Sequence, residues 1–191
     1  DGKLVISGKT WNGNDYDIAL LRYNTDGTMD ATVDPVNTLN GAPTYTEGGA
    51  AVVLDSNVQI FDAELSAANN FNGATLTLTR NGGANAEDVF SATGTLSSLI
   101  DEGPLVLNGI VIGGVLQNFG GTLILVFNGN ATGALVNSAM QQIAYSNSSD
   151  VPPASAQINW TFNDGNTGSQ GTGVALQATG STTVTITAVN D

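Results

Sequence analysis

The chain has 191 residues, with 17 acidic against four basic side chains, a formal net charge of −13, and neither histidine nor cysteine. This composition excludes the usual zinc and copper sites, Cys–His nucleophiles and Ser–His–Asp triads, which all need one of the missing residues. So negative a chain would also repel nucleic acids and anionic membranes.

The hydrophobic content of 41% is enough for a packed core, and no stretch is long and apolar enough to span a bilayer. A chain without cysteine fits a reducing cytosol or a bacterial surface protein stabilised by calcium instead of disulfides. The 24 glycines, with abundant Thr, Asn and Ser, favour the surface protein. We therefore expect an extracellular location on a bacterial cell, within a chain that continues beyond both ends.

The first thirty residues read as one β-hairpin. Lys3–Gly8 and Tyr16–Tyr23 are strand-like, and Asn12–Asp15 has the composition of a turn. An isolated hairpin is marginally stable in water, so it must pack on something. Turn-forming residues in 31–43 then predict a boundary, with a hairpin and linker over 1–43 and a main domain over 44–191.

The main domain is predicted to have an all-β fold, because its sequence has many short strand patterns separated by Gly- and Asn-rich turns. We expect an antiparallel Greek-key β-sandwich, cadherin- or immunoglobulin-like, with one short helix. Asn108-Gly109 predicts a two-residue type I′ hairpin turn. The predicted strands are Ala50–Leu54, Asn57–Asp62, Ala74–Arg80, Glu87–Ser91, Leu105–Ile112, Val115–Phe119, Thr122–Asn128, Ala156–Asn163, Gly173–Thr179 and Thr182–Val189.

The helix is predicted from apolar residues at helical spacing between Leu135 and Ile143, with Asn128 or Asn130 available to cap its start. Large apolar side chains near it and in the later strands are interpreted as core, because gap filling is the usual role of methionine and alternation buries every second residue. These are Met140, Tyr145, Trp160 and Phe162.

Scattered carboxylates suggest calcium, which takes six to eight oxygen ligands in flexible geometry. The first candidate site combines Glu47, Asp62, Glu64 and Asp191. Asp62 and Glu64 are two residues apart at a predicted strand end, so their side chains would leave on one face. Gly48-Gly49 would let Glu47 present its carboxylate.

A second candidate calcium site follows the strand that ends near Phe162. Asp164 and Asn166 could supply a carboxylate and an amide oxygen from an Asp-Gly-Asn turn. A plain turn is the alternative, because Asp-Gly is common in turns and no complete EF-hand loop is present.

A third candidate site is the loop from Arg80 to Asp88. The first half of the loop could bind a ligand through Arg80, Asn81, Gly82, Gly83 and Asn85, and Glu87 and Asp88 could hold an ion. Arg80 could pair with these acids or with a bound carboxylate. The alternative is a hairpin loop with a local Arg–Glu pair.

Two resemblances add to these patterns. Asp1-Gly2-Lys3-Leu4-Val5-Ile6-Ser7-Gly8 and Ala19-Leu20-Leu21-Arg22-Tyr23-Asn24-Thr25-Asp26-Gly27 resemble the second half of the bacterial delta-sixty repeat. The resemblance covers about thirty residues and implies a piece of a propeller-like array.

Residues 44–191 resemble modules of very large repeats-in-toxin adhesins, including their peptide-binding type. The segments that carry the resemblance are Thr46–Ala50, Val58–Glu64, Arg80–Phe90, Gln141–Asn147, Trp160–Gly165 and Thr182–Asp191. An early Glu, an Asp-x-Glu triplet and a terminal Asn-Asp are similar to cadherin-like repeats, which bind calcium at domain junctions. The resemblance implies Ca²⁺ as cofactor and neighbouring modules as partners.

Three functions are compatible with these patterns. The first is a calcium-dependent adhesion module that binds a peptide or glycan on another cell, with calcium coordinating a ligand carboxylate. The second is a structural spacer that calcium stiffens. The third, a glycoside hydrolase or lyase using Glu87 with Asp164, has the weakest signal because aromatic residues are only 6% of the chain. We expect a protein that is not an enzyme.

Overall fold

The computed structural model describes residues 4–11, 16–23, 25, 39–166 and 176–189, and the chain divides into two compact units, 1–36 and 37–191. In the first unit, β1 (Leu4–Trp11) and β2 (Tyr16–Tyr23) pair antiparallel, with Leu4 opposite Tyr23 and Trp11 opposite Tyr16. The predicted hairpin is therefore confirmed.

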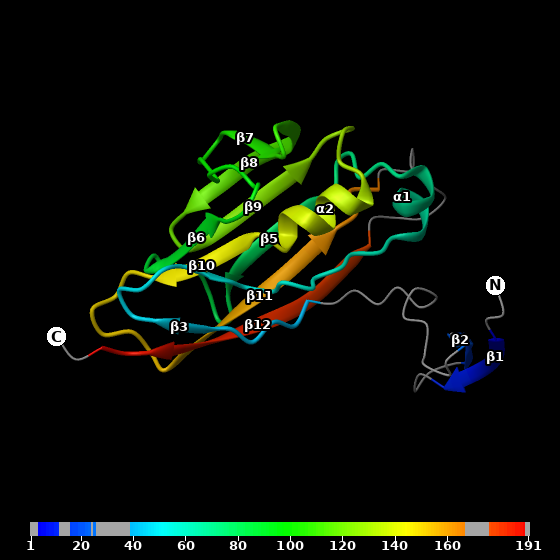
Figure 1. Ribbon diagram of the computed structural model, residues 1–191, viewed down its shortest axis with the longest axis horizontal. Helices are drawn as coiled ribbons and strands as arrows, with labels where there is room; N and C mark the ends of the chain where they lie inside the picture. The colour runs from blue at the N-terminus through cyan, green and yellow to red at the C-terminus, as the bar shows by residue number, and fades with distance from the viewer. Residues whose placement is uncertain (1–3, 12–15, 24, 26–38, 167–175, 190–191) are drawn as a thin grey trace. The chain divides into compact units, whose positions relative to one another are not determined.

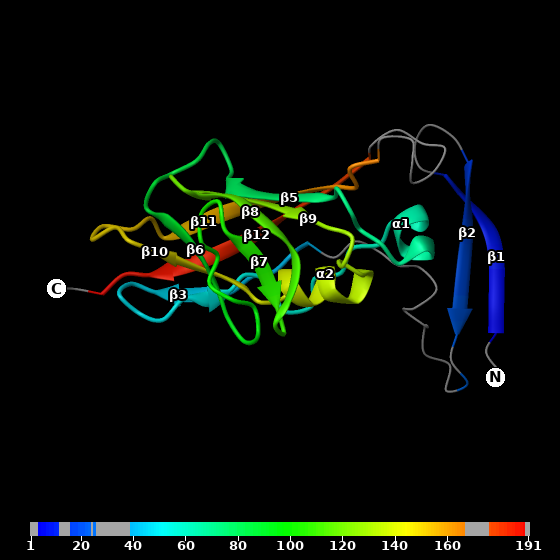
Figure 2. The ribbon, with the colours of Figure 1, turned by 90° about the horizontal axis from the view of Figure 1, so that it is seen from above.

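The second unit is a sandwich of two β-sheets (Figures 1 and 2), as expected for an all-β chain. The larger sheet has the strand order β3-β12-β11-β5-β9-β8-β7, and the smaller has β4-β10-β6. The strands are β3 (Thr44–Thr46), β4 (Val52–Val53), β5 (Thr75–Arg80), β6 (Asp88–Ala92), β7 (Pro104–Leu107), β8 (Ile110–Phe119), β9 (Thr122–Phe127), β10 (Ile143–Asn147), β11 (Ser155–Asn163) and β12 (Gln177–Thr187).

The sandwich carries two short helices, α1 (Ala63–Ala68) and α2 (Gly133–Met140). The second confirms the predicted helix, but its cap is Thr132, whose Oγ accepts the N–H of Leu135 at 3.3 Å. Asn128 and Asn130 instead donate from their side-chain amides to the carbonyl of Val111. No helix in the described parts of the chain is long and apolar enough to cross a membrane.

The prediction for the region before α1 was wrong. Asn57–Asp62 was predicted as a strand, but it contains only an isolated bridge residue and leads into the helix. Asp62 has extended backbone angles and its Oδ1 accepts the N–H groups of Glu64 (3.0 Å) and Leu65 (2.7 Å). A carboxylate that accepts these first-turn N–H groups is a helix N-cap, so local capping starts a helix here.

Two of the predicted strands are parts of longer strands in the structure. Val115–Phe119 continues the strand that begins at Ile110, and the strand predicted to start at Thr182 is part of β12. The Asn108-Gly109 turn is confirmed, with φ of 52° and 78°, as a type I′ turn requires.

The boundary between the units lies earlier than predicted. The carbonyls of Leu39, Gly41 and Pro43 accept the N–H groups of Ser181 (2.9 Å), Thr183 (3.1 Å) and Thr185 (3.0 Å), all in β12. These three linker residues therefore belong to the sandwich. The pairing continues into β3, which runs parallel to β12, whereas the other described strand pairs are antiparallel.

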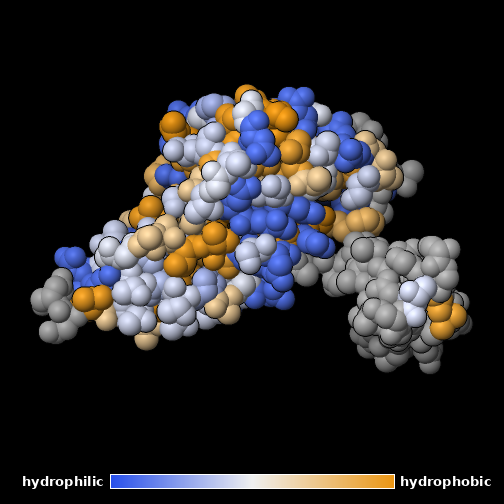
Figure 3. Space-filling model, viewed as in Figure 1, coloured by the Kyte–Doolittle hydropathy of each residue, from blue (hydrophilic) through white to orange (hydrophobic). Residues whose placement is uncertain are grey.

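The core lies between the sheets and is one continuous cluster of apolar side chains. Trp160 is fully buried, and its Nε1 donates to Oγ1 of Thr182 at 2.8 Å, which satisfies the polar end of the indole. Met140, Tyr145 and Phe162 are also buried, as predicted. On the face seen in Figure 3, exposed hydrophobic residues form separate patches among polar ones.

Candidate functional site

The loop between β5 and β6 is closed by an ion pair. Arg80 ends β5 and Asp88 begins β6, and the guanidinium donates from Nε (2.7 Å) and Nη2 (2.5 Å) to the two carboxylate oxygens. The carboxylate raises the pKa of Arg80 further above its usual value. The sequence allowed Arg80 to pair with either acid of the loop, and in the structure its partner is Asp88.

Asp88 is the centre of a buried polar network. Asp88 is 3% exposed. Its Oδ1 also accepts hydrogen bonds from the hydroxyl of Tyr145 (2.6 Å) and the side-chain amide of Asn147 (3.2 Å). Tyr45 donates its hydroxyl to the carbonyl of Asn147 at 3.1 Å. Burial, followed by the hydrogen bond to Asp88, raises the pKa of Tyr145 to about 12. The network links β5 in one sheet to β6 and β10 in the other.

The two asparagine side chains of the loop also have partners within the sandwich. Asn81 donates to Oε1 of Gln157 at 3.0 Å, and its own Oδ1 accepts from Asn159 at 3.3 Å. Oδ1 of Asn85 accepts the N–H of Glu87 at 2.9 Å. Gly82 and Gly83 have positive φ and would have nothing within 4 Å of an added Cβ. The loop is thus held by contacts within itself and with β11.

The three described residues of the first predicted calcium site do not lie together. Glu47 follows β3, and its Oε2 accepts the N–H of Val189 at 2.8 Å, where the chain leaves β12. Asp62 caps α1 and Glu64 lies in its first turn. Both ribbon views place α1 at one end of the sandwich and the end of β12 at the other. Asp191 lies outside the described residues.

The second predicted site is built around a buried turn. Asp164 is 4% exposed, and its Oδ1 accepts the N–H groups of Asn166 (2.9 Å) and Leu176 (3.1 Å). Oδ1 of Asn163 accepts the N–H of Gly165 at 2.8 Å. Asp164 therefore binds backbone N–H groups both directly after β11 and directly before β12.

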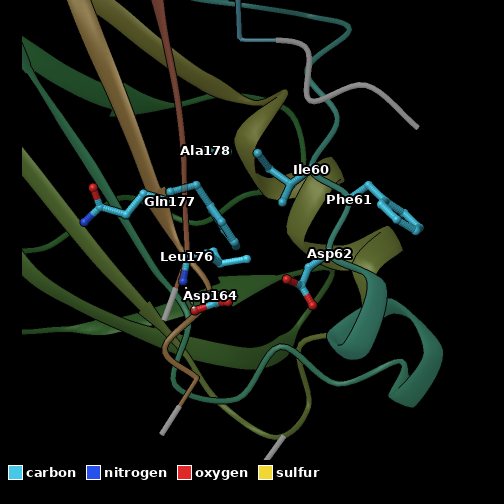
Figure 4. Close-up of a pocket in the computed structure, with 8 residues that line it drawn as sticks. Ile60, Phe61, Asp62, Asp164, Leu176, Gln177 and Ala178 are labelled. Atoms are coloured by element: carbon cyan, nitrogen blue, oxygen red, sulfur yellow. Dashed lines mark hydrogen bonds between the residues drawn. The ribbon is translucent and has the colours of Figure 1, made fainter. Parts of the chain in front are cut away.

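The structure brings Asp62 and Asp164 to one pocket, which sequence reasoning did not predict. The pocket has a volume of about 260 Å³, and both carboxylates border it together with apolar side chains (Figure 4). The remaining lining residues are Ile60, Phe61, Phe162, Leu176, Gln177 and Ala178. Within the described part of the chain, no group of three Asp or Glu side chains is placed to hold a metal ion.

The carboxylate pair considered for a hydrolase is also separated. Glu87 lies next to the end of β5 at Arg80, whereas Asp164 follows Asn163, which is opposite the start of that strand at Thr75. The strand between these points spans about 16 Å at a rise of roughly 3.3 Å per residue. Glycosidase carboxylates lie about 5 to 9.5 Å apart, so these two residues do not form such a pair.

Sequence reasoning missed the partners of Asp88. Tyr145 and Asn147 are two residues apart in β10 and so share one face, which is a signal that the sequence contains. It also missed Asp55, which is 3% exposed and accepts the N–H groups of Asn40 (2.9 Å) and Asn57 (3.1 Å). A buried acid that binds distant backbone has no short sequence signature.

Comparison with known proteins gives a match in the first unit only. A family model described as a domain of unknown function (DUF5122) beta-propeller matches residues 1–32, which contain the β1–β2 hairpin and the residues that resemble the delta-sixty repeat. No curated protein and no solved structure matches the chain.

Proposed function

We propose that the sandwich from residue 39 onward is a rigid spacer module of a bacterial extracellular adhesin. In this proposal, calcium binds where the chain leaves the module and stiffens the link to the next one. The module holds its neighbours apart and in line, and it performs no chemistry.

The observation that carries the proposal is the contact between Glu47 and Val189. The carboxylate of Glu47 accepts the N–H of Val189 at 2.8 Å, and the N–H of Glu47 donates to the carbonyl of Thr187 at 3.0 Å. The departing chain is thus fixed at Val189 beside an acidic side chain, immediately before the sequence Asn190-Asp191. Carboxylate and carbonyl oxygens are the ligands that calcium prefers.

Net charge supports the same proposal. A chain with a formal charge of −13 carries carboxylates that repel one another, and a divalent cation at the junction would relieve this repulsion. The alternative use of the Arg80 loop is less well supported, because the Nε and Nη2 groups of Arg80 already bind Asp88.

The test is thermal unfolding of the full chain in excess calcium and in excess EDTA. A ligand that binds only the folded state raises its stability, by about 2.7 kcal/mol at one hundred times its Kd. We expect calcium to raise Tm, Glu47→Gln to lose much of this rise, and Glu64→Gln at the far end to keep it. Equal Tm values in calcium and EDTA would refute the calcium-stiffened spacer.

A second function, calcium-dependent adhesion to a peptide or glycan, draws on the pocket between Asp62 and Asp164. Two carboxylates beside apolar walls could hold a cation that in turn binds a ligand carboxylate. Calorimetry with peptide and glycan libraries, with and without chelator, tests it. We expect Asp164→Asn to abolish calcium-dependent binding, and binding that ignores the chelator would contradict this function.

A further inference from the structure

The first and the last described segments of the sandwich unit in sequence run side by side in the same direction. Residues 39–47, here called the leading segment, pair in parallel with residues 181–187 of β12. The register is continuous, from Leu39 beside Ser181 to Thr46 opposite Thr187. We call this arrangement the terminal strand pair.

The hydrogen bonds of this pair lie across the direction in which the chain would be stretched. In a parallel ladder the N–H···O=C bonds connect the strands sideways. Tension applied before residue 39 and after residue 189 pulls the two strands in opposite directions along their length. All the bonds between them are then loaded together, whereas tension that separates the strands from one end loads the bonds in turn.

We infer that the terminal strand pair is the element that makes this unit resist stretching along the chain. The inference extends the proposed spacer function, because a spacer between modules transmits tension. The unit stays folded under tension until the backbone bonds between the leading segment and β12 break as a group. Forced unfolding is governed by the unfolding rate, so the bonds that must break first set the resistance.

Contacts on the far side of the leading segment reinforce the pair. Oδ2 of Asp55 accepts the N–H of Asn40 at 2.9 Å, and Asp55 is buried. A Cβ added at Gly41 would lie 1.9 Å from the carbonyl oxygen of Leu54, so the backbone there fits closely against the neighbouring loop. The leading segment is therefore held from both sides where tension enters the unit.

Buried side chains also hold the two strands together, along the same stretch as the hydrogen bonds. Tyr45 of the leading segment is 2% exposed, and Val184 and Ile186 of β12 face the same core. Sliding one strand along the other would move these side chains out of their core positions. Packing and hydrogen bonding therefore resist the same displacement.

The absence of cysteine allows a direct test in the full chain, because introduced thiols serve as unique attachment points for single-molecule pulling. Asn40→Cys with Val189→Cys stretches the terminal strand pair lengthwise. Ala50→Cys with Val189→Cys pulls both strands from the same end and peels them apart. The three positions are exposed.

We expect the first unfolding event to need at least about twice the force in the lengthwise geometry, because its bonds break together. Equal forces in the two geometries, or a higher force in the peeling geometry, would overturn the inference.

A backbone variant tests the same bonds within the lengthwise geometry. Thr183→Pro removes the N–H that donates to the carbonyl of Gly41 at 3.1 Å, whereas Thr183→Ala removes the same exposed side chain and keeps the N–H. We expect the proline variant to unfold at a lower lengthwise force than the alanine variant, and equal forces would count against the inference. If the proline variant does not fold, the comparison of geometries decides.

This test is separate from that of the proposed function. The pulling comparison in EDTA addresses the terminal strand pair alone, and the melting experiment addresses calcium alone. A calcium-dependent Tm with equal forces would leave the spacer and remove the inference. A higher force in the lengthwise geometry, with no effect of calcium on Tm, would support the inference and refute the calcium-stiffened spacer.

Discussion

The guanidinium of Arg80 and the carboxylate of Asp88 join the two sheets of the sandwich through a two-point ion pair, with Nε and Nη2 each donating to one carboxylate oxygen. The pair closes the loop that sequence patterns assigned to ligand binding. Because Asp88 also accepts from Tyr145, a change at this one side chain affects three strands.

Asp88→Ala should lower the free energy of unfolding by about 1 to 3 kcal/mol, because it leaves the hydroxyl of Tyr145 and the side-chain amide of Asn147 without their buried acceptor. The side chain of Asp88 is fully buried, whereas that of Arg80 is 18% exposed, so water can solvate the guanidinium that loses its partner. Urea unfolding at neutral pH measures the loss. Glu87→Ala, one residue earlier, is the control and should change the free energy by less than about 1 kcal/mol. Similar losses in both variants would contradict a special role for Asp88.

Alkaline pH should destabilise the protein through Tyr145. Its pKa is about 12 in the folded state against the usual 10, so between these values the unfolded state loses a proton that the native state keeps. The stability contributed by the neutral phenol is complete below pH 10 and falls as the pH rises toward 12. Urea unfolding across this range should show a steeper decline for the parent than for Tyr145→Phe. Parallel declines would contradict the shift.

Adjacent glycines in the turn between β8 and β9 should differ in their tolerance of a side chain. Gly120 and Gly121 both have positive φ, but only at Gly121 would a Cβ meet another atom, the carbonyl oxygen of Asn85 at 1.9 Å. We expect Gly120→Ala to cost about 1 kcal/mol from backbone strain, and Gly121→Ala to cost about 1 to 3 kcal/mol more from the clash. Thermal unfolding of the pair measures the difference, and equal losses would show that the Asn85 loop moves aside.

The role of Asp62 can be separated into capping and metal binding. Asp62→Ala removes the acceptor for the N–H groups of Glu64 and Leu65 and should cost about 1 kcal/mol in EDTA. Asp62→Asn keeps an acceptor and should match the parent in EDTA. If Asp62 also binds calcium, the Asn variant should gain less stability from added calcium than the parent does. Identical gains would restrict Asp62 to capping.

Local patterns were sufficient to predict much of the fold. Alternation marked the strands that contain Leu76 and Trp160, and Asn108-Gly109 marked a hairpin turn, because each signal depends only on neighbouring residues. The helix α1 was missed because its six residues are too few to show periodicity, and its cap at Asp62 was interpreted as a metal ligand.

The candidate site was less predictable because its geometry depends on contacts between distant segments. Asp62 and Glu47 look alike in the sequence, yet the topology sends one to the helix end and the other to the C-terminal end of β12. The pairing of Pro43 with Thr185 spans most of the chain, so a linker composition concealed a strand-like segment. Asp164 and Asp62 meet only through the packing of β11 near α1.

The hydrogen bond between Trp160 and Thr182 has a practical consequence. The chain has two tryptophans, and Trp160 is the one in the sandwich, with its indole N–H attached to the strand that leaves the unit. Replacing Trp11 in the hairpin with Phe would leave Trp160 as the single tryptophan of the chain. Its emission would change when β12 detaches, giving an optical signal for the release of the last strand without any added dye.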